Sequence, residues 1–519
     1  MNNYCRYKII LIIIGCVCGT AAFPQITRER LLQFISEEKN NSNSGTIDFY
    51  TRLNYNTAWI QSNNLYNRDI FLNSLKSSAV LGLVASDYPI KYIDSLNKGS
   101  VPLLNRNDSL DAEVRITGAA IHFYKDVAYG NIKPFFGYNE LKYMPDCRNV
   151  PILLADFIAT GKLRLLLTEL SPPFPEIILL EQKINWFYTV MADSNFHEVI
   201  IKSAQVTRNN KPLVSKLHQL GLIIFPDFKI SDSLMKVKVK EVQRQFNLLT
   251  DGVLRHTTLQ ELNIPLSARM KQLRLSVNYY RWLYCLIQNQ SVIVVNIPAA
   301  YLKVYQDNKA ILEMRIIVGK QSTPTPTLAS SVREVILYPY WHVPDSIATK
   351  ELLPAIKRNP GYIDAGNYQV LNPSGKIMNP YSIDWHALST SYFPYIIRQS
   401  TGCDNALGLL KLNFYSPFGV YLHDTPKKSL FGLNRRYFSH GCMRMEKPME
   451  LGHLVLKNNM KAIDTLEQKG CLRNRAPITV RADENMPVIV WYNPAGVDST
   501  GRVLFYEDVY RKFDWLKRK

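Results

Sequence analysis

The hydrophobic pattern of this chain changes its period near Ser291, and this change limits the folds that are open to it. Between Arg269 and Ile287, apolar residues recur every three or four positions, which is typical of an amphipathic helix. In 312–318, apolar residues instead alternate with Glu313 and Arg315, as a strand with one solvated face requires. The sequence therefore predicts an α+β multidomain chain, helical before this point and mainly β after it.

Length and turn signals divide the chain further. A chain of 519 residues is too long for one ordinary core, so about two to four domains are expected. In 211–265, apolar residues spaced at i, i+4 and i+7, with Asp251-Gly252 as a tight turn, predict a compact unit. The expected segments are a mainly helical domain (25–200), this compact module (205–266), a linker helix (267–289), a mainly β domain (290–485) and a β-rich tail (486–519).

The mainly β domain contains an insertion at 345–397. This segment is rich in Pro, Asn and Tyr and contains the turn signals Asn359-Pro360-Gly361 and Asn372-Pro373-Ser374-Gly375. It is longer than an ordinary loop, and long loops that persist in compact domains tend to act as lids. We therefore expect it to cover a functional site.

Residues 1–22 have the features of an export signal. Arg6 and Lys8 precede an apolar run at 9–17, and Thr20-Ala21-Ala22 resembles a cleavage site with small residues. The run is shorter than the roughly 20 residues that span a bilayer. Two alternatives stay open: a lipoprotein box ending at Cys16, and an uncleaved membrane anchor. In each case we expect the rest of the chain in the periplasm or cell envelope, with membrane attachment through the N-terminus in the two alternatives.

The net charge of +19 favours an anionic partner or surface. Because an exported chain rarely meets nucleic acid, we expect no nucleic-acid partner, and a cell wall or membrane face fits better. The Lys and Arg residues are scattered along the sequence, so much of this charge is also explained as solvated surface.

The chain has eight cysteines, and their positions divide them into three groups. Three lie in the first 22 residues and Cys442 lies in the motif described next. Cys147, Cys285, Cys403 and Cys471 remain, and they are compatible with two disulfides in an oxidising compartment or with four buried thiols.

The stretch 420–446 holds the chemistry. Ser439-His440-Gly441-Cys442 follows His423, and Arg444 comes two residues later. A cysteine attacks as its thiolate, so it needs a nearby base, for which His423 and His440 are the candidates. Gly441 lets the backbone turn sharply and leaves amide N–H groups for a substrate oxyanion.

Two other uses of these residue types are disfavoured. A zinc site is not expected, because the chain has no C-x-x-C and no H-E-x-x-H spacing. A papain-type protease would carry a motif such as C-G-S-C-W near the mature N-terminus, and none is present.

His423, Ser439-His440-Gly441-Cys442 and Arg444 together resemble the signature of the L,D-transpeptidases, which cross-link peptidoglycan through a cysteine nucleophile. Two further segments, 339–347 and 398–408, resemble the large multidomain periplasmic branch of that family. The resemblance implies a helical scaffold domain, a three-helix peptidoglycan-binding-like module and a capping subdomain at 345–397.

The resemblance also implies a set of site residues. Cys442 would be the nucleophile and His423 its base, while the Gly441 and Cys442 amides, with His440, would hold the oxyanion. Site organisation would fall to Ser439 and Arg444. The weaker candidates for substrate contact are Trp341, Asn405 and Trp385.

The implied reaction joins two peptidoglycan stem peptides by a 3-3 cross-link, through a Cys442 thioester and with release of D-Ala. It needs no metal and no organic cofactor, and carbapenem β-lactams are expected to acylate the same cysteine. The alternatives are an L,D-carboxypeptidase or other murein amide hydrolase with the same site, an enzyme acting on a wall-attached lipoprotein, and a non-catalytic wall-binding scaffold.

Overall fold

The computed structural model describes residues 26–37, 44–141, 147–202, 204, 206–207, 210–224 and 230–514. The expected signal at 1–22, with Cys16, lies outside these residues. The chain divides into two compact units. Unit 1 comprises Met1–Lys76, Ala85–Tyr124 and Asn149–Thr168, and unit 2 comprises Ser77–Val84, Lys125–Arg148 and Glu169–Lys519.

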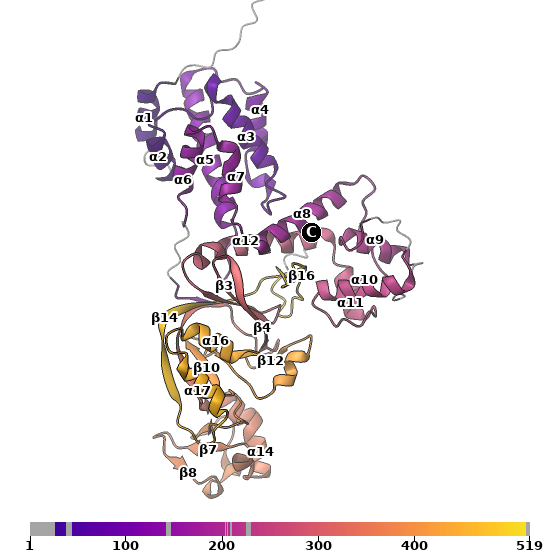
Figure 1. Cartoon of the computed structure of the whole chain (residues 1–519), viewed down its shortest axis with the longest axis vertical. Helices are drawn as coiled ribbons and strands as arrows, with labels where there is room; N and C mark the ends of the chain where they lie inside the picture. The colour runs from indigo at the N-terminus through magenta and orange to yellow at the C-terminus, as the bar shows by residue number, and fades with distance from the viewer. Residues whose placement is uncertain are drawn as a thin grey trace, which may run out of the picture. The chain divides into compact units, whose positions relative to one another are not determined.

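Unit 1 is helical, as predicted for this part of the chain (Figure 1). Its core packs aromatic rings, among them Trp59 against Phe71 and Phe71 against Phe123. Glu113 is buried in this core and accepts hydrogen bonds from three consecutive backbone amides, including that of Trp59. Its helices lie wholly or mostly in this unit: α1 (Arg28–Glu37), α2 (Ser44–Arg52), α3 (Leu65–Lys76), α4 (Ile90–Asn97), α5 (Arg106–Tyr129), α6 (Val150–Ala159) and α7 (Leu163–Leu170).

Unit 2 begins with five helices that lead into a large sheet. They are α8 (Pro175–Ala192), α9 (Lys211–Gln219), α10 (Asp232–Gln245), α11 (His256–Leu262) and α12 (Leu266–Ile287). The last of them covers the predicted linker helix, but its polar side is buried as well. Arg281 pairs with Glu181 of α8 at 2.7 Å, and the Asn278 side chain donates to the Gly82 carbonyl. Residues distant in sequence therefore pack around the whole of α12.

The large sheet is mixed, with the order β1-β5-β10-β11-β13-β4-β3-β2-β14. An additional pairing of β14 with β5 closes this path on itself, and β12 pairs with β4 outside it. The strands are β1 (Tyr138–Asn139), β2 (Val292–Asn296), β3 (Tyr301–Gln306), β4 (Lys309–Gly319), β5 (Leu328–Leu337), β10 (Leu410–Phe414), β11 (Leu422–His423), β12 (Tyr437–Ser439), β13 (Met443–Met445) and β14 (Ile478–Trp491). The helices α16 (Pro448–Val455) and α17 (Lys461–Lys469) follow β13, and α16 packs on β10 and β14.

Two details of this sheet concern its turns and its limits. Asp307 and Asn308 both have positive φ, of 48° and 63°, as the tight hairpin turn between β3 and β4 requires. The predicted boundary at 485 falls within β14. Residues 488–491 pair with β2, so the apolar end of this strand completes the sheet and does not begin a separate tail. A short hairpin, β15 (Ala495–Val497) and β16 (Val503–Phe505), follows.

The insertion at 345–397 has a fold of its own. Its sheet has the order β6-β9-β7-β8, formed by β6 (Trp341–His342), β9 (Ile396–Gln399), β7 (Tyr368–Leu371) and β8 (Ile377–Met378). With the helices α13 (Asp345–Ile347), α14 (Leu353–Arg358) and α15 (Tyr362–Ala365), this sheet encloses a separate hydrophobic core that contains Ile356 and Trp385. We call this part, residues 341–399, the cap.

Two disulfides join the four cysteines that the sequence left open. Cys147 bonds to Cys285, with their Cα atoms 5.6 Å apart, and Cys403 bonds to Cys471, with their Cα atoms 5.1 Å apart. Cys442 is the free cysteine of the described residues. Of the two interpretations, the disulfides hold.

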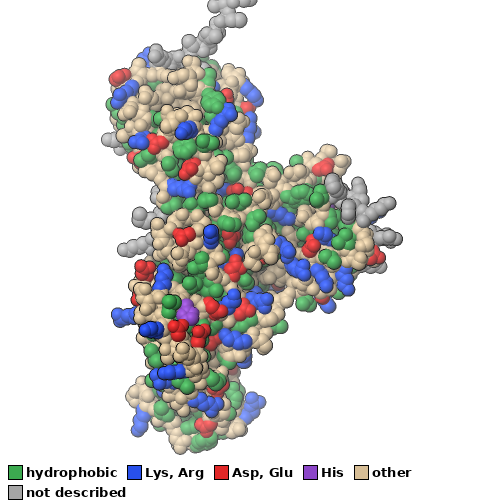
Figure 2. Space-filling view, viewed as in Figure 1, with side chains coloured by type: hydrophobic (Ala, Val, Ile, Leu, Met, Phe, Trp, Pro, Cys, Tyr) green, Lys and Arg blue, Asp and Glu red, His purple; other side chains and the backbone are tan. Residues whose placement is uncertain are grey.

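The described helices include none with the length and apolar character that a membrane crossing needs. On the face shown in Figure 2, Lys and Arg side chains are interspersed with Asp and Glu and form no single basic field. This agrees with the scattered positions of the basic residues in the sequence.

Candidate active site

Strand register brings three cationic or titratable side chains into one row. Lys411 of β10 lies opposite His423 of β11, and His423 lies opposite Arg444 of β13. Residues opposite each other in a sheet direct their side chains to the same face. The row therefore lines one face of the sheet at the end of β11.

Cys442 belongs to the same face. Cys442 and Tyr421 stand one residue before β13 and β11. The charges of Lys411 and Arg444 act on the Cys442 thiol, and the Tyr421 ring lies 5.6 Å from the His423 ring between centroids, so both side chains belong to this face. The residues that follow them, Met443 and Leu422, are fully buried in the opposite face, which is the hydrophobic core. The alternation thus separates the reactive residues from the core.

The turn that presents Cys442 is fixed by hydrogen bonds. The Ser439 hydroxyl donates to the Cys442 carbonyl at 2.5 Å and accepts from the Gly441 amide at 3.1 Å. Thr325 donates its hydroxyl to the Gly441 carbonyl at 2.8 Å. Gly441 has a φ of 116°, a conformation in which residues with a side chain are strained. Ser439 is therefore the residue that holds this turn.

These bonds correct one expectation about the oxyanion site. The Gly441 amide already donates to Ser439 and is not free to bind a substrate oxygen. Within the described ranges, the Cys442 amide has no hydrogen-bond acceptor. Of the two amides predicted for this role, only that of Cys442 is available.

His423 is buried and held by the backbone. Its Nδ1 lies 2.5 Å from the Asp424 carbonyl oxygen, so Nδ1 carries the proton that it donates there and Nε2 is left to exchange protons. The Asp424 carboxylate is anchored in turn by the Leu409 amide at 2.9 Å and the Lys428 ammonium at 2.6 Å. The group that orients His423 is therefore a backbone carbonyl.

Electrostatics keep the resting pair neutral. Burial, followed by the positive charges of Arg444 and Lys411, lowers the pKa of His423 to about 3. Burial also raises the pKa of the Cys442 thiol, while Tyr421, Lys411 and Arg444 act in the opposite direction. The structure records no hydrogen bond between His423 and Cys442 in the part of the chain that it describes. Burial thus favours the neutral forms of both His423 and Cys442.

Sequence reasoning missed two residues at this face. Burial raises the pKa of the Tyr421 hydroxyl, the neighbouring Cys442 raises it further, and Trp341 acts in the opposite direction. Lys411 places its ammonium 4.0 Å from the centroid of the Tyr421 ring. Tyr421 was detectable, because it lies two residues before His423 and so shares its face. Lys411 was not, since strand 410–414 had not been recognised.

Comparison with known proteins identifies the domain that carries these residues. Residues 290–472 match the L,D-transpeptidase catalytic domain, and residues 44–183 match the family described as Scaffold domain. By this match, residues 290–472 are similar to L,D-transpeptidase catalytic domains. The α+β multidomain prediction and the family resemblance are both confirmed.

Relatives share this domain over part of their length. A Haemophilus influenzae protein named "Putative L,D-transpeptidase" is 37% identical over 221 residues, which cover 42% of this chain and 44% of that protein. The match therefore spans less than half of the relative. Among solved structures, the ertapenem-acylated catalytic domain of the E. faecium L,D-transpeptidase is 15% identical, covering 39% of this chain and 97% of that one, with a TM-score of 0.17. An L,D-transpeptidase from Stackebrandtia nassauensis is 13% identical, covering 57% and 98%, with a TM-score of 0.22.

Three predicted residues of the transpeptidase domain face away from Cys442 or into the protein. The His440 ring nitrogen Nε2 lies 2.8 Å from Glu351 of the cap, so the ring is not aimed at an oxyanion. Asn405 is fully buried and its amide donates to the Pro339 and Ser400 carbonyls. Trp385 lies in the core of the cap. In this arrangement Asn405 and Trp385 are supports of the fold and do not line the site.

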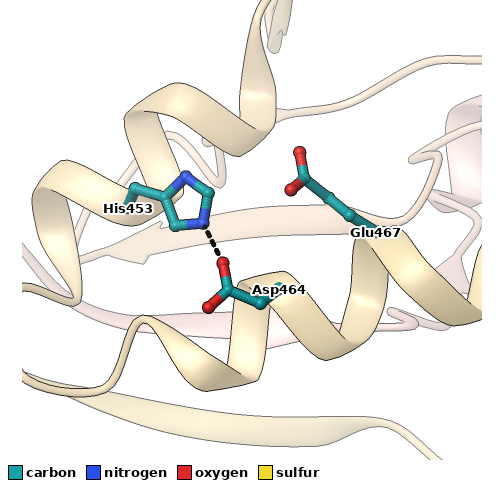
Figure 3. A group of neighbouring side chains, drawn as sticks. All are labelled: His453, Asp464 and Glu467. Atoms are coloured by element: carbon teal, nitrogen blue, oxygen red, sulfur yellow. Dashed lines mark hydrogen bonds and ion pairs between the residues drawn. The ribbon is translucent and has the colours of Figure 1, made fainter.

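One group of side chains in the transpeptidase domain has the composition of a metal site. Nε2 of His453 on α16 lies 3.0 Å from Asp464 on α17, and Glu467 lies one turn further along α17 (Figure 3). Their ligand atoms lie within 4.8 Å of one another, but both carboxylates are exposed. None of these residues belongs to the Cys442 face.

Proposed function

We propose that this protein is an L,D-transpeptidase that forms 3-3 cross-links in peptidoglycan through an acyl-enzyme on Cys442. The observation that carries the proposal is the strand register, which lines up Lys411, His423 and Arg444 on the face where Cys442 lies. A nucleophile, a base with a fixed tautomer, a free amide and two cations are the parts that acyl transfer to sulfur needs.

The first half-reaction consumes a donor stem peptide. The Cys442 sulfur attacks the carbonyl carbon between the third, diamino residue and the following D-Ala, and its proton passes to Nε2 of His423. Because burial opposes a standing charge on His423, this transfer accompanies the attack and does not precede it. The Cys442 amide holds the oxyanion. The C–N bond then breaks, His423 returns the proton to the leaving D-Ala nitrogen, and a thioester remains.

The second half-reaction forms the cross-link. The side-chain amine of a second stem attacks the thioester carbonyl and loses one proton to Nε2 of His423. The C–S bond breaks, the new amide forms, and the proton returns from His423 to the Cys442 sulfur. The enzyme is regenerated with the neutral pair that the burial of both groups favours.

Lys411 and Arg444 supply positive charge for this cycle. Neither forms an ion pair with a carboxylate among the described residues, and Nε of Arg444 is buried without a hydrogen-bond partner there. A guanidinium binds a carboxylate through two parallel hydrogen bonds. We assign the carboxylate of the departing D-Ala to Arg444 and the support of the developing thiolate to Lys411.

The same proposal includes the location. Two disulfides are typical of proteins in oxidising compartments, and the pattern at 1–22 is typical of an export signal. Both support a place in the periplasm or cell envelope, where peptidoglycan is built.

The experiment that tests the function is intact-mass analysis after exposure to a carbapenem. We expect one covalent adduct on the wild-type protein, and none on Cys442→Ala. Incubation with purified muropeptides then assigns the acceptor, because cross-linked dimers support the transpeptidase and shortened monomers alone support the carboxypeptidase. If the wild-type protein forms no adduct and alters no muropeptide, the proposal that it is an enzyme is refuted.

A further inference from the structure

A second cavity of unit 2 lies apart from the residues of the Cys442 face. Its volume is about 320 Å³, within the usual range of ligand sites. Four segments form its walls: the end of α10 with the chain that follows it, the strands β3 and β4, the segment 432–436, and the hairpin β15–β16. The lining residues used below are Arg244, Lys303, Glu313, Arg315, Arg436, Asp498 and Arg502.

The lining carries more positive than negative charge, with five cations against Glu313 and Asp498. Both carboxylates are already engaged. Glu313 lies 3.0 Å from the Lys303 ammonium, and Asp498 lies 3.9 Å from the Arg502 guanidinium. In the described ranges, Arg244, Arg315 and Arg436 form no ion pair with a carboxylate. The cavity is therefore an uncompensated positive site.

Arg436 contributes a buried positive charge to this cavity that no carboxylate of the described residues pairs with. Its side chain is 6% exposed, and its guanidinium donates only to backbone carbonyls, among them those of Ala300 and Leu433. A buried charge without a counter-charge is costly unless an anion completes the site. Because the carbonyls already occupy Arg436, it acts through its field. Arg244 is exposed, and the partly exposed Arg502 approaches Asp498 through one terminal nitrogen only, at 3.9 Å, so both can contact a ligand directly.

We propose that this cavity binds a carboxylate-bearing peptidoglycan stem peptide as a second, non-catalytic wall site. The size of the cavity admits a short peptide segment, and the guanidinium groups of Arg244 and Arg502 in its lining can each bind a carboxylate. Tyr301 and Tyr506 add apolar surface beside polar tips. The identity of the ligand rests on the proposed function, whereas the preference for an anion rests on the cavity alone.

The test uses the full chain with Cys442→Ala, so that the probe is bound and not consumed. The probe is a reduced disaccharide tripeptide, titrated calorimetrically, and its amidated form, which lacks the carboxylate charges, serves as the counterpart. We expect two binding sites. The double change Arg244→Gln and Arg502→Gln should remove one of them or weaken it at least about tenfold, and raised salt should weaken it as well.

Controls separate this site from the catalytic one and from general anion binding. Lys309→Gln removes an exposed cation outside the cavity and should leave both sites intact. The double change made in the Cys442 protein should leave its carbapenem acylation rate unchanged. Equal binding by the double variant, or by the amidated probe, would overturn the proposal. Acetate that competes as well as the tripeptide would reduce the cavity to a general anion site and refute the wall ligand.

The two proposals fail in different ways. If the double variant loses the second binding site and Cys442 is never acylated, the cavity is a ligand site but the proposed transpeptidase activity is refuted. If Cys442 is acylated normally but the protein has only one binding site, the proposed activity is supported and the second site is refuted.

Discussion

Two regions of unit 2 bury positive charge, and they differ in what faces it. On α12, the Arg281 side chain is 0% exposed and its guanidinium meets Glu181 at 2.7 Å. On the Cys442 face, burial lowers the pKa of both Lys411 and Arg444, yet among the residues described neither forms an ion pair with a carboxylate. One region pairs its cations within the protein and the other leaves them for a partner.

The difference separates charge that maintains the fold from charge that serves chemistry. A buried cation with an internal carboxylate is compensated at all times, so its loss should be felt in stability. A cation beside Cys442 is compensated only when a thiolate or a substrate carboxylate is present. Its removal should therefore lower the reaction rates of Cys442. Substitutions in the two regions should therefore change different measurements.

The largest expected effect is on the Cys442 face. His423→Gln keeps a donor for the Asp424 carbonyl but removes the base, and general-base catalysis is typically worth about 10²–10⁴-fold. We expect carbapenem acylation, followed by intact mass over time, to slow by about 10³-fold with no loss of thermal stability. If the variant acylates at the wild-type rate, His423 is not the base.

On α12 the reverse pattern is expected. Glu181→Gln leaves Arg281 buried without its counter-charge, which typically costs about 3–5 kcal/mol. We expect a lower midpoint of the unfolding transition of unit 2 by denaturant or heat, with the acylation rate at 25 °C unchanged. Glu450→Gln, an exposed carboxylate on α16, is the matched control and should leave both quantities unchanged. A variant as stable as the control would show that the pair on α12 does not maintain the fold.

A smaller effect than those of His423→Gln and Glu181→Gln is expected at Lys411, and it should appear in the pKa of the Cys442 thiol. Its positive charge favours the Cys442 thiolate, so Lys411→Met should raise the thiol pKa further. The rate of alkylation by iodoacetamide follows the thiolate fraction, and its pH profile should shift to higher pH. For a shift of about one unit, alkylation at pH 8 falls about tenfold. Lys411→Arg keeps the charge and should restore most of the rate. An unshifted profile would remove Lys411 from the site.

How far the sequence predicted these regions depends on how local the signal was. The change of period near Ser291 and the motif around Cys442 each lie within one unbroken stretch of sequence. The α+β fold was predicted from the first, and the resemblance to the L,D-transpeptidases from the second. The position of Lys411 depends on how β10 pairs with β11, which begins eight residues after β10 ends. Register between strands is set by tertiary packing, so the residue was not identifiable from its own segment.

Other misses have the same cause. The Gly441 amide was expected to be free because the motif alone does not show that the Ser439 hydroxyl accepts its hydrogen bond. The polar residues of α12 were expected at the surface, but Asn278 and Arg281 meet Gly82 and Glu181 from elsewhere in the chain. In each case a contact between distant or folded-back segments decided the outcome.

The smallest expected effect compares two exposed histidine–carboxylate pairs. His440, two residues before Cys442, meets Glu351 of the cap at 2.8 Å, whereas His453 on α16 meets Asp464 on α17 at 3.0 Å. Exposed pairs contribute about 0–1 kcal/mol, so Glu351→Gln should lower kcat/KM for a muropeptide about two- to fivefold, because the cap then holds the turn of Cys442 less firmly. Asp464→Asn breaks a pair of similar geometry away from the site and should leave kcat/KM unchanged. Equal losses in both variants would mean that the contact between the cap and His440 has no special part in the reaction.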